Sequence, residues 1–155
     1  MRKGDSAMWY ITRRYIHLAL WSWGPPLAAM AAMFVASAQP KYGPPSQAAF
    51  VYFSGAMPVF PGVWDVLIKK SGHVLAFGVL ALLYLRALLA WDCPRRRAIW
   101  LAILLTLGYA FLDEIHQAFV PGRHPSLPDV GLDTIGAVLF TFAHGKMARQ
   151  RTNAP

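Results

Sequence analysis

The sequence predicts an all-α integral membrane bundle of four transmembrane helices, with both chain termini cytoplasmic. Three observations predict this fold class: an apolar composition, four long apolar stretches, and an uneven distribution of Lys and Arg. Of the 155 residues, 56% are apolar and 14% are charged, whereas about a quarter are charged in an ordinary soluble domain. A water-soluble globule of this length could not bury so much apolar surface, and a disordered chain would be far more polar. The length predicts a single domain spanning 1–155.

The four apolar stretches cover residues 17–38, 72–91, 98–120 and 129–144 approximately. A transmembrane helix needs about 20 mostly apolar residues, so each is a candidate span. The fourth is the shortest and begins with a polar turn, which we place at the level of the lipid head groups. Residues 39–71 are rich in Pro and Gly and carry several aromatic side chains. We therefore expect this segment to be an extracytoplasmic loop at the membrane interface.

The basic residues set the predicted orientation. Eleven of the 15 Lys and Arg residues precede the first stretch, flank the connection between the second and third, or follow the fourth. Positive charge accumulates on the cytoplasmic side of membrane proteins, so that end of the bundle should be cytoplasmic. The net charge of +8 follows from this topology, and no soluble basic domain is left over for nucleic acid, which we do not expect as a partner.

Most of the remaining polar residues fall at the opposite, extracytoplasmic end of the predicted helices. Lys70 and His73 share a helix face because they are three residues apart, and Asp129 and Asp133 share one because they are four apart. Ionisable groups cost at least ~2.5 kcal/mol at the bilayer centre and therefore tend to face the bundle interior and to pair. Helices of alternating direction bring them to one level near the outer leaflet. The polar residues at this end are Lys69, Lys70, His73, Asp113, Glu114, His116, Gln117, Arg123, Asp129 and Asp133. We call the eight of them other than Lys69 and His116 the polar cluster.

Two stretches resemble the signatures of the VanZ-like family of membrane proteins. Residues 69–80 (KKSGHVLAFGVL) are similar to its basic-x-x-His-x-x-x-aromatic helix start. Residues 113–123 (DEIHQAFVPGR), followed by Ser126, Asp129, Asp133, Thr134 and Gly136, resemble its second signature, Asp-Glu-x-x-Gln-x-Phe-x-Pro-Gly-Arg and then Asp-x-x-x-Asp/Asn-x-x-Gly. The resemblance covers residues 65–143. This chain has Lys69 where many members have Asp, which makes the local field more positive.

The resemblance implies a small multi-pass protein of the bacterial plasma (inner) membrane, from a family named for a member linked to glycopeptide (teicoplanin) resistance. Matched onto this chain, the family's polar positions are the eight residues of the polar cluster, and ionisable residues inside a membrane are by default functional. Three hypotheses follow for that cluster, and the sequence leaves open which of them holds.

In the first hypothesis, Lys70, His73 and Arg123 bind a phosphate through charge-assisted hydrogen bonds, and the four carboxylates orient these cations or contact a sugar or amine. The partner is then a phosphate-bearing envelope lipid or glycolipid, such as a polyprenyl phosphate or a cell-wall precursor lipid. In the third hypothesis, the protein is a non-catalytic structural or regulatory subunit, and the polar cluster only holds the helices together.

The second hypothesis is a membrane phosphatase or transferase that acts on a lipid phosphate. His73 would be the nucleophile or general base, Asp113 or Glu114 would orient it, and Arg123 would stabilise the phosphoryl transition state. No metal and no cofactor are predicted, because Asp113-x-x-His116 occurs once whereas di-iron bundles use paired motifs. The sequence leaves catalysis and the oligomeric state open.

Overall fold

The computed structural model describes residues 3–39 and 61–152, and the side chains of residues 13–39, 67–68 and 70–147. The regular structure in these residues is entirely α-helical, as the sequence predicts. The helices are α1 (Lys3–Ser37), α3 (Pro61–Ala90), α4 (Arg95–Gln117) and α5 (Leu127–Thr152).

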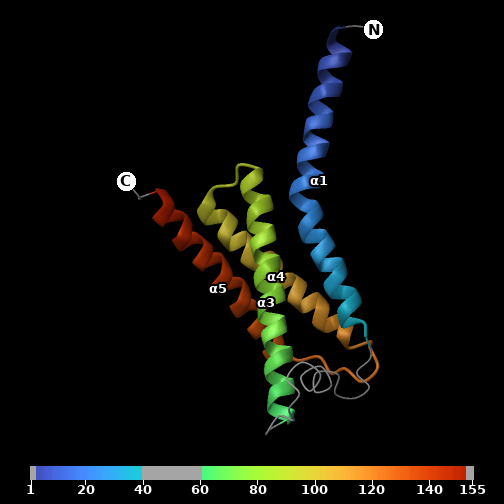
Figure 1. The fold of residues 1–155 in the computed structure, drawn as a ribbon. Coiled ribbons are helices and arrows are strands. Elements are labelled where there is room, and N and C mark those ends of the chain that lie inside the picture. Colours follow the sequence, from blue (N-terminus) through green and yellow to red (C-terminus); the bar gives the residue numbers. More distant parts are fainter. Residues whose placement is uncertain (1–2, 40–60, 153–155) are drawn as a thin grey trace, which may run out of the picture.

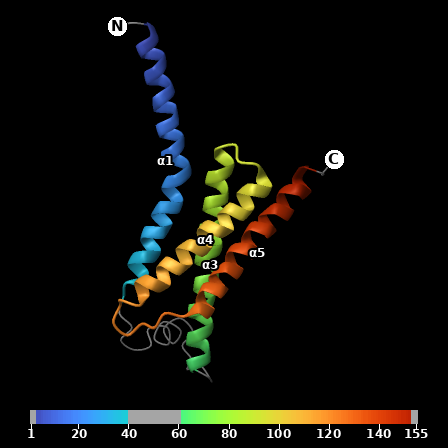
Figure 2. The same cartoon turned by 180° about the vertical axis from the view of Figure 1, so that it is seen from behind.

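Consecutive helices run in opposite directions (Figures 1 and 2). The N-terminal end of α1, the turn between α3 and α4 and the C-terminal end of α5 point toward one end of the molecule. The C-terminal end of α1, the beginning of α3 and the connection between α4 and α5 lie at the other. The α3 helix packs most extensively against α5 and then against α4, while α1 packs on α3 and α4 but not on α5 within the described ranges.

The helix boundaries differ from the predicted spans in two places. The α1 helix begins at Lys3, well before the predicted start near residue 17. The α3 helix begins at Pro61, so residues 61–71 are helical although the sequence analysis assigned them to the loop. Proline is favoured at the first helical position because the N–H that it lacks would have no partner there. Residues 40–60 of the predicted loop lie outside the described residues.

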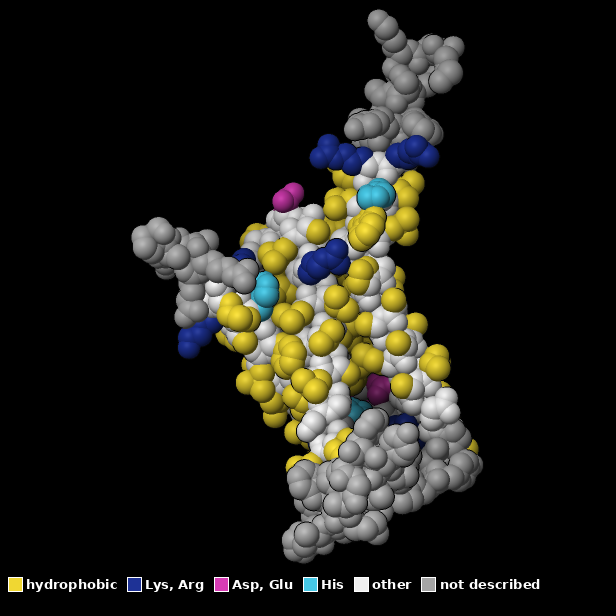
Figure 3. Space-filling model, in the orientation of Figure 1, with side chains coloured by type: hydrophobic (Ala, Val, Ile, Leu, Met, Phe, Trp, Pro, Cys, Tyr) yellow, Lys and Arg dark blue, Asp and Glu magenta, His cyan; other side chains and the backbone are white. Residues whose placement is uncertain are grey.

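Within the described residues, three helical segments are long and apolar enough to cross a membrane, namely Arg13–Ser37, Lys70–Ala90 and Arg95–Gln117. The α5 helix is not among them, so the fourth predicted span is not confirmed. Asp129 and Asp133 in its first turns and Lys146 toward its end restrict its apolar part. Large apolar side chains are exposed along the middle of the molecule (Figure 3), and exposed apolar surface on this scale marks a membrane or protein contact.

Two glycines bring α3 and α5 close together. A Cβ atom added at Gly136 would lie 3.1 Å from the Cα atom of Val74 and closer still to its carbonyl oxygen. A Cβ atom added at Gly78 would lie 2.6 Å from the ring of Phe140. Small residues at a helix interface allow backbones to approach in this way, and the approach places the polar residues of α3 opposite those of α5.

Candidate functional site

The polar residues of α3 and α5 form two successive pairs. Lys70 forms an ion pair with Asp129 at the outer position. One turn further into the bundle, the Nδ1 atom of His73 lies 3.3 Å from the Oδ1 atom of Asp133. The side chains of Lys70, Asp129 and His73 are 37%, 24% and 31% exposed, whereas that of Asp133 is 1% exposed. The carboxylate of Asp133 is therefore enclosed by protein, while the other three side chains reach the surface.

The inner pair is close but does not satisfy its own hydrogen-bonding capacity. The Nδ1 atom of His73 and the Oδ1 atom of Asp133 are buried, and neither has a hydrogen-bond partner among the described residues. An unsatisfied buried polar atom costs about 1–3 kcal/mol. The described residues therefore leave the hydrogen-bonding capacity of the pair partly unused.

A chain of hydrogen bonds joins the end of α4 to the end of α1. The Nε2 atom of Gln117 donates to Oδ2 of Asp113 at 2.7 Å, and Nη1 of Arg123 donates to Oε1 of Gln117 at 3.2 Å. Arg123 also donates from Nε to the carbonyl oxygen of Gln39 at 3.2 Å and from Nη2 to that of Ala36 at 3.4 Å. A cation is favoured at a helix C-terminus, where carbonyl groups lack partners in the helix. This position fixes the guanidinium of Arg123 beside the interior of the bundle.

Glu114 ties the end of α4 to the beginning of α5. Its Oε2 atom accepts a hydrogen bond of 2.6 Å from the backbone N–H of Ser126. The carbonyl of Ser126 in turn accepts the N–H of Asp129 at 2.9 Å, which starts the helix. Because Glu114 is buried, it orients the first turn of α5 and with it the carboxylate of Asp129.

A cavity of about 200 Å³ lies between α1, α3 and α4. It lies between His73, which belongs to the inner pair, and the hydrogen-bonded group of Asp113 and Arg123. His73, Asp113 and Arg123 line it, together with the apolar ring of Phe77 and with Ser37. The Oδ1 atom of Asp113 is buried and has no hydrogen-bond partner within the described residues. Figure 3 shows acidic, basic and histidine side chains together at this end of the molecule, below the apolar middle. The cavity therefore combines a cation, an imidazole and a carboxylate around one small space.

A protein-family model described as VanZ/LLP1 matches residues 22–144. The chain belongs to the VanZ/LLP1 family. The matched region contains the whole polar cluster, and it extends through α1 from Ser22, beyond the stretch 65–143 that carries the resemblance in sequence. No curated protein and no solved structure matched the chain. Family membership together with the three apolar helices indicates a membrane protein.

All eight residues of the cluster lie at one end of this VanZ/LLP1 protein, but they have different positions. Three line the cavity, as described above, and Asp133 lies beside one of them, His73. Lys70 and Asp129 form the exposed pair, and Gln117 and Glu114 hold neighbouring groups in place. The side chain of Lys69 lies outside the described residues.

The second hypothesis is changed in one respect. The carboxylate that contacts His73 is that of Asp133, whereas the sequence analysis assigned the orienting role to Asp113 or Glu114. Those two carboxylates accept hydrogen bonds from Gln117 and from the backbone of Ser126 instead.

His116 contacts α1 rather than the cavity. Its Nδ1 atom lies 3.2 Å from Oγ of Ser37, and its ring stacks on Phe34 with the centroids 3.9 Å apart. The described part of the chain contains no group of three or more His, Cys, Asp or Glu side chains that could hold a metal ion. Sequence reasoning missed Ser37 in this VanZ/LLP1 site, and a lone serine near the end of an apolar helix gives no signal by which it could be found.

Proposed function

We propose that this VanZ/LLP1 protein is a multi-pass protein of the bacterial plasma membrane, with cytoplasmic termini and with α5 as a fourth span. We further propose that its polar cluster faces outward and binds the phosphate-bearing head group of an envelope lipid or glycolipid, such as a polyprenyl phosphate or a cell-wall precursor lipid. The observation that carries this proposal is the cavity lined by Arg123, His73 and Asp113, in which two polar atoms are buried without partners. Recognition of such a lipid would connect the family to glycopeptide resistance.

The level of the cavity along the helices supports a head group as the ligand. Lys70 begins one of the apolar segments, and Gln117 ends another. The cluster thus coincides with the boundary of the apolar surface, where lipid head groups lie. The volume of the cavity, about 200 Å³, is below the roughly 300–1,000 Å³ of ordinary ligand pockets. The cavity accordingly suits a phosphate and its neighbouring atoms, while the lipid chain stays outside on the apolar helix surfaces.

The charges indicate which groups of the ligand are recognised. Lys70 is already paired with Asp129, so Arg123 is the principal cation for a phosphate. Its three hydrogen bonds use one N–H on each nitrogen, which leaves one further N–H on each terminal nitrogen. The free Oδ1 atom of Asp113 can accept a hydrogen bond from a hydroxyl or ammonium group. This combination favours a head group that carries both a phosphate and a hydrogen-bond donor.

A specific observation favours a second candidate function, hydrolysis or transfer of the lipid phosphate. The buried carboxylate of Asp133 next to Nδ1 of His73 resembles the way in which a carboxylate orients a catalytic imidazole. Arg123 lines the same cavity as His73 and would stabilise the charge of a phosphoryl transition state. His73 would then act as the nucleophile or the general base.

Lipid binding by the detergent-purified full-length protein tests the proposal. Native mass spectrometry would compare a polyprenyl phosphate with the uncharged polyprenol of the same length, and we expect binding of the phosphate form only. Arg123→Gln should weaken that binding at least tenfold, because hydrogen bonds to charged groups contribute about 1.5–3 kcal/mol and 1.4 kcal/mol is a factor of ten. The matched control is Arg97→Gln, which removes the same charge from an exposed position at the other end of the molecule.

Further variants separate the three hypotheses. Asp113→Asn should weaken binding of a sugar-bearing polyprenyl phosphate but not of the plain phosphate, because only the former offers donors to its carboxylate. Release of phosphate that His73→Gln abolishes would assign the enzyme function. Equal binding of polyprenol and polyprenyl phosphate, or equal weakening by the Arg123 and Arg97 variants, would refute phosphate recognition. Unchanged binding with a lowered melting temperature in Arg123→Gln would assign the cluster to assembly alone.

A further inference from the structure

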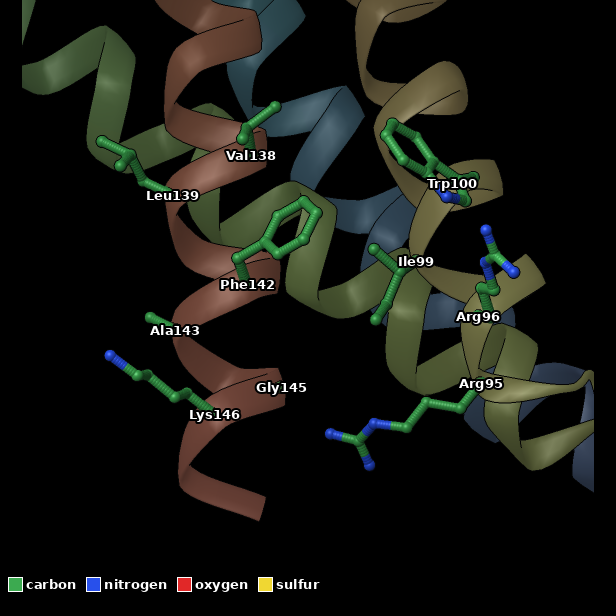
Figure 4. Close-up of a pocket in the computed structure, with 10 residues that line it drawn as sticks. All are labelled: Arg95, Arg96, Ile99, Trp100, Val138, Leu139, Phe142, Ala143, Gly145 and Lys146. Atoms are coloured by element: carbon green, nitrogen blue, oxygen red, sulfur yellow. The ribbon is translucent and has the colours of Figure 1, made fainter. Parts of the chain in front are cut away.

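A second and larger cavity lies at the opposite end of the molecule. It measures about 840 Å³ and runs between the first turns of α4 and the C-terminal half of α5 (Figure 4). Ile99 and Trp100 line it from α4, and Leu139 and Phe142 from α5. The rings of Trp100 and Phe142 meet edge to face with their centroids 6.2 Å apart. We call this space the α4–α5 groove, and its walls are mainly apolar.

Three cations line the α4–α5 groove. Arg95 reaches from α4 toward α5, Lys146 lies at a similar level on α5 with its ammonium turned away from Arg95, and Arg96 lies beside Trp100 on α4 (Figure 4). No carboxylate is among the described lining residues, and in the part of the chain that the structure covers none of the three cations has an ion-pair partner. The groove therefore presents an apolar channel with a concentrated positive charge at its mouth.

We propose that the α4–α5 groove binds an anionic glycerophospholipid, with an acyl chain along the apolar walls and the phosphate between Arg95 and Lys146. The volume lies within the range of ligand pockets, and the arrangement of apolar walls below a basic rim matches an amphiphile with a negative head group. Basic pockets between membrane helices recognise anionic head groups in this way. A second copy of this chain is a poorer occupant, because its own net charge of +8 would meet the same cations.

This site is separate from the polar cluster and does not depend on its proposed function. The two share no residue, and they lie at opposite ends of α4, which runs from Arg95 to Gln117. A lipid could therefore occupy the groove while the cavity at the polar cluster is empty.

Titration of the full-length protein in detergent with phosphatidylglycerol or phosphatidylcholine, followed by native mass spectrometry, tests the inference. We expect the anionic lipid to bind more tightly. Arg95→Gln/Lys146→Gln should weaken its binding by about 30-fold, which corresponds to roughly 1 kcal/mol per cation. The matched control is Arg14→Gln/Arg86→Gln, which removes two exposed cations outside the groove and should leave the affinity within about twofold.

A glycine pair tests the apolar part of the site without changing its charge. Gly145 of α5 lines the α4–α5 groove, and a Cβ atom added there would meet nothing within 4 Å. The same holds for a Cβ atom added at Gly108 of α4, which does not line the groove. Gly145→Leu should fill the groove and weaken phosphatidylglycerol binding more than tenfold, whereas Gly108→Leu should not.

Three results would overturn the inference: equal affinity for the two lipids, equal effects of the two double variants, or equal effects of the two glycine variants. A lipid-independent dimer that Gly145→Leu dissociates would also overturn it, because the occupant would then be a second copy of the chain.

Discussion

The close approach of α3 and α5 at Gly136 predicts that a single methyl group will separate the two helices. A Cβ atom there would lie 3.1 Å from both the Cα and the carbonyl carbon of Val74 and closer to its oxygen. Because the neighbour is backbone, no side-chain rotation can relieve the contact. Gly131, on the same helix, has nothing within 4 Å of the added Cβ, and Gly78 meets only the side chain of Phe140. The three glycines therefore form a series in which only the local space differs.

Gly136→Ala should destabilise the protein by about 2 kcal/mol. Overpacking costs about 1–3 kcal/mol, and we take the upper end because the backbone must move. The higher helix propensity of Ala returns roughly 1 kcal/mol. For a chain of this length, about 1 kcal/mol shifts the melting temperature by about 2–4 °C, so we expect a loss of about 4–8 °C. Gly131→Ala should raise the melting temperature, and Gly78→Ala should fall between the two.

Thermal unfolding in one detergent, followed by tryptophan fluorescence, measures this series. Lipid binding at the polar cluster provides a second measurement, because separation of α3 from α5 would pull His73 away from Asp133. The reasoning is refuted if Gly136→Ala is as stable as Gly131→Ala, since the helices would then not be in backbone contact at this point.

Two further predictions use the same unfolding measurement. Tyr109→Phe should lower the melting temperature by about 2–4 °C, because the Tyr109 hydroxyl donates a 2.6 Å hydrogen bond to the carbonyl of Met30 and such a bond contributes about 1 kcal/mol. Tyr84→Phe should lower it less, since the Tyr84 hydroxyl donates to a thioether sulfur, which is a weak acceptor. Equal shifts in the two variants would contradict this ranking. Lys70→Ala should lower the free energy of unfolding by about 0.2–1 kcal/mol, because Lys70 is one partner of an exposed ion pair. Glu114→Ala should lower it by about 1.5–3 kcal/mol, because the buried carboxylate accepts a backbone N–H at the start of α5. A larger loss for Lys70→Ala would show that Glu114 does not anchor that turn.

Residue spacing predicted which faces of α3 and α5 carry the polar residues, but it could not predict their partners. Lys70 and His73 were expected to share a face and to pair with acidic groups, and each lies beside an aspartate of α5, although both side chains stay partly exposed. That Asp133 rather than Asp113 contacts His73 depends on the separation of α3 and α5, which Gly136 sets through a contact with backbone atoms. A sequence pattern contains no such distance.

The acceptors of Arg123 and the start of α3 could not be predicted from the sequence. Arg123 donates to the carbonyl oxygens of Ala36 and Gln39, and every residue carries a carbonyl, so residue type does not identify the acceptor. The start of α3 was missed because the prolines and glycines of residues 39–71 predict a loop, whereas Pro61 is at the first helical position, where proline is favourable.

Incomplete pairing within the polar cluster favours a ligand over a purely structural role. A cluster that served only to join helices would be most stable with every buried group paired, because a partly satisfied polar network is less stable than an apolar core. Here the Nδ1 atom of His73 and the Oδ1 atoms of Asp113 and Asp133 are buried without hydrogen-bond partners among the described residues. Two of these residues, His73 and Asp113, line the cavity. Under the proposed function, a head group that supplies partners to these two atoms would recover about 1–3 kcal/mol for each, and its binding should therefore raise the melting temperature.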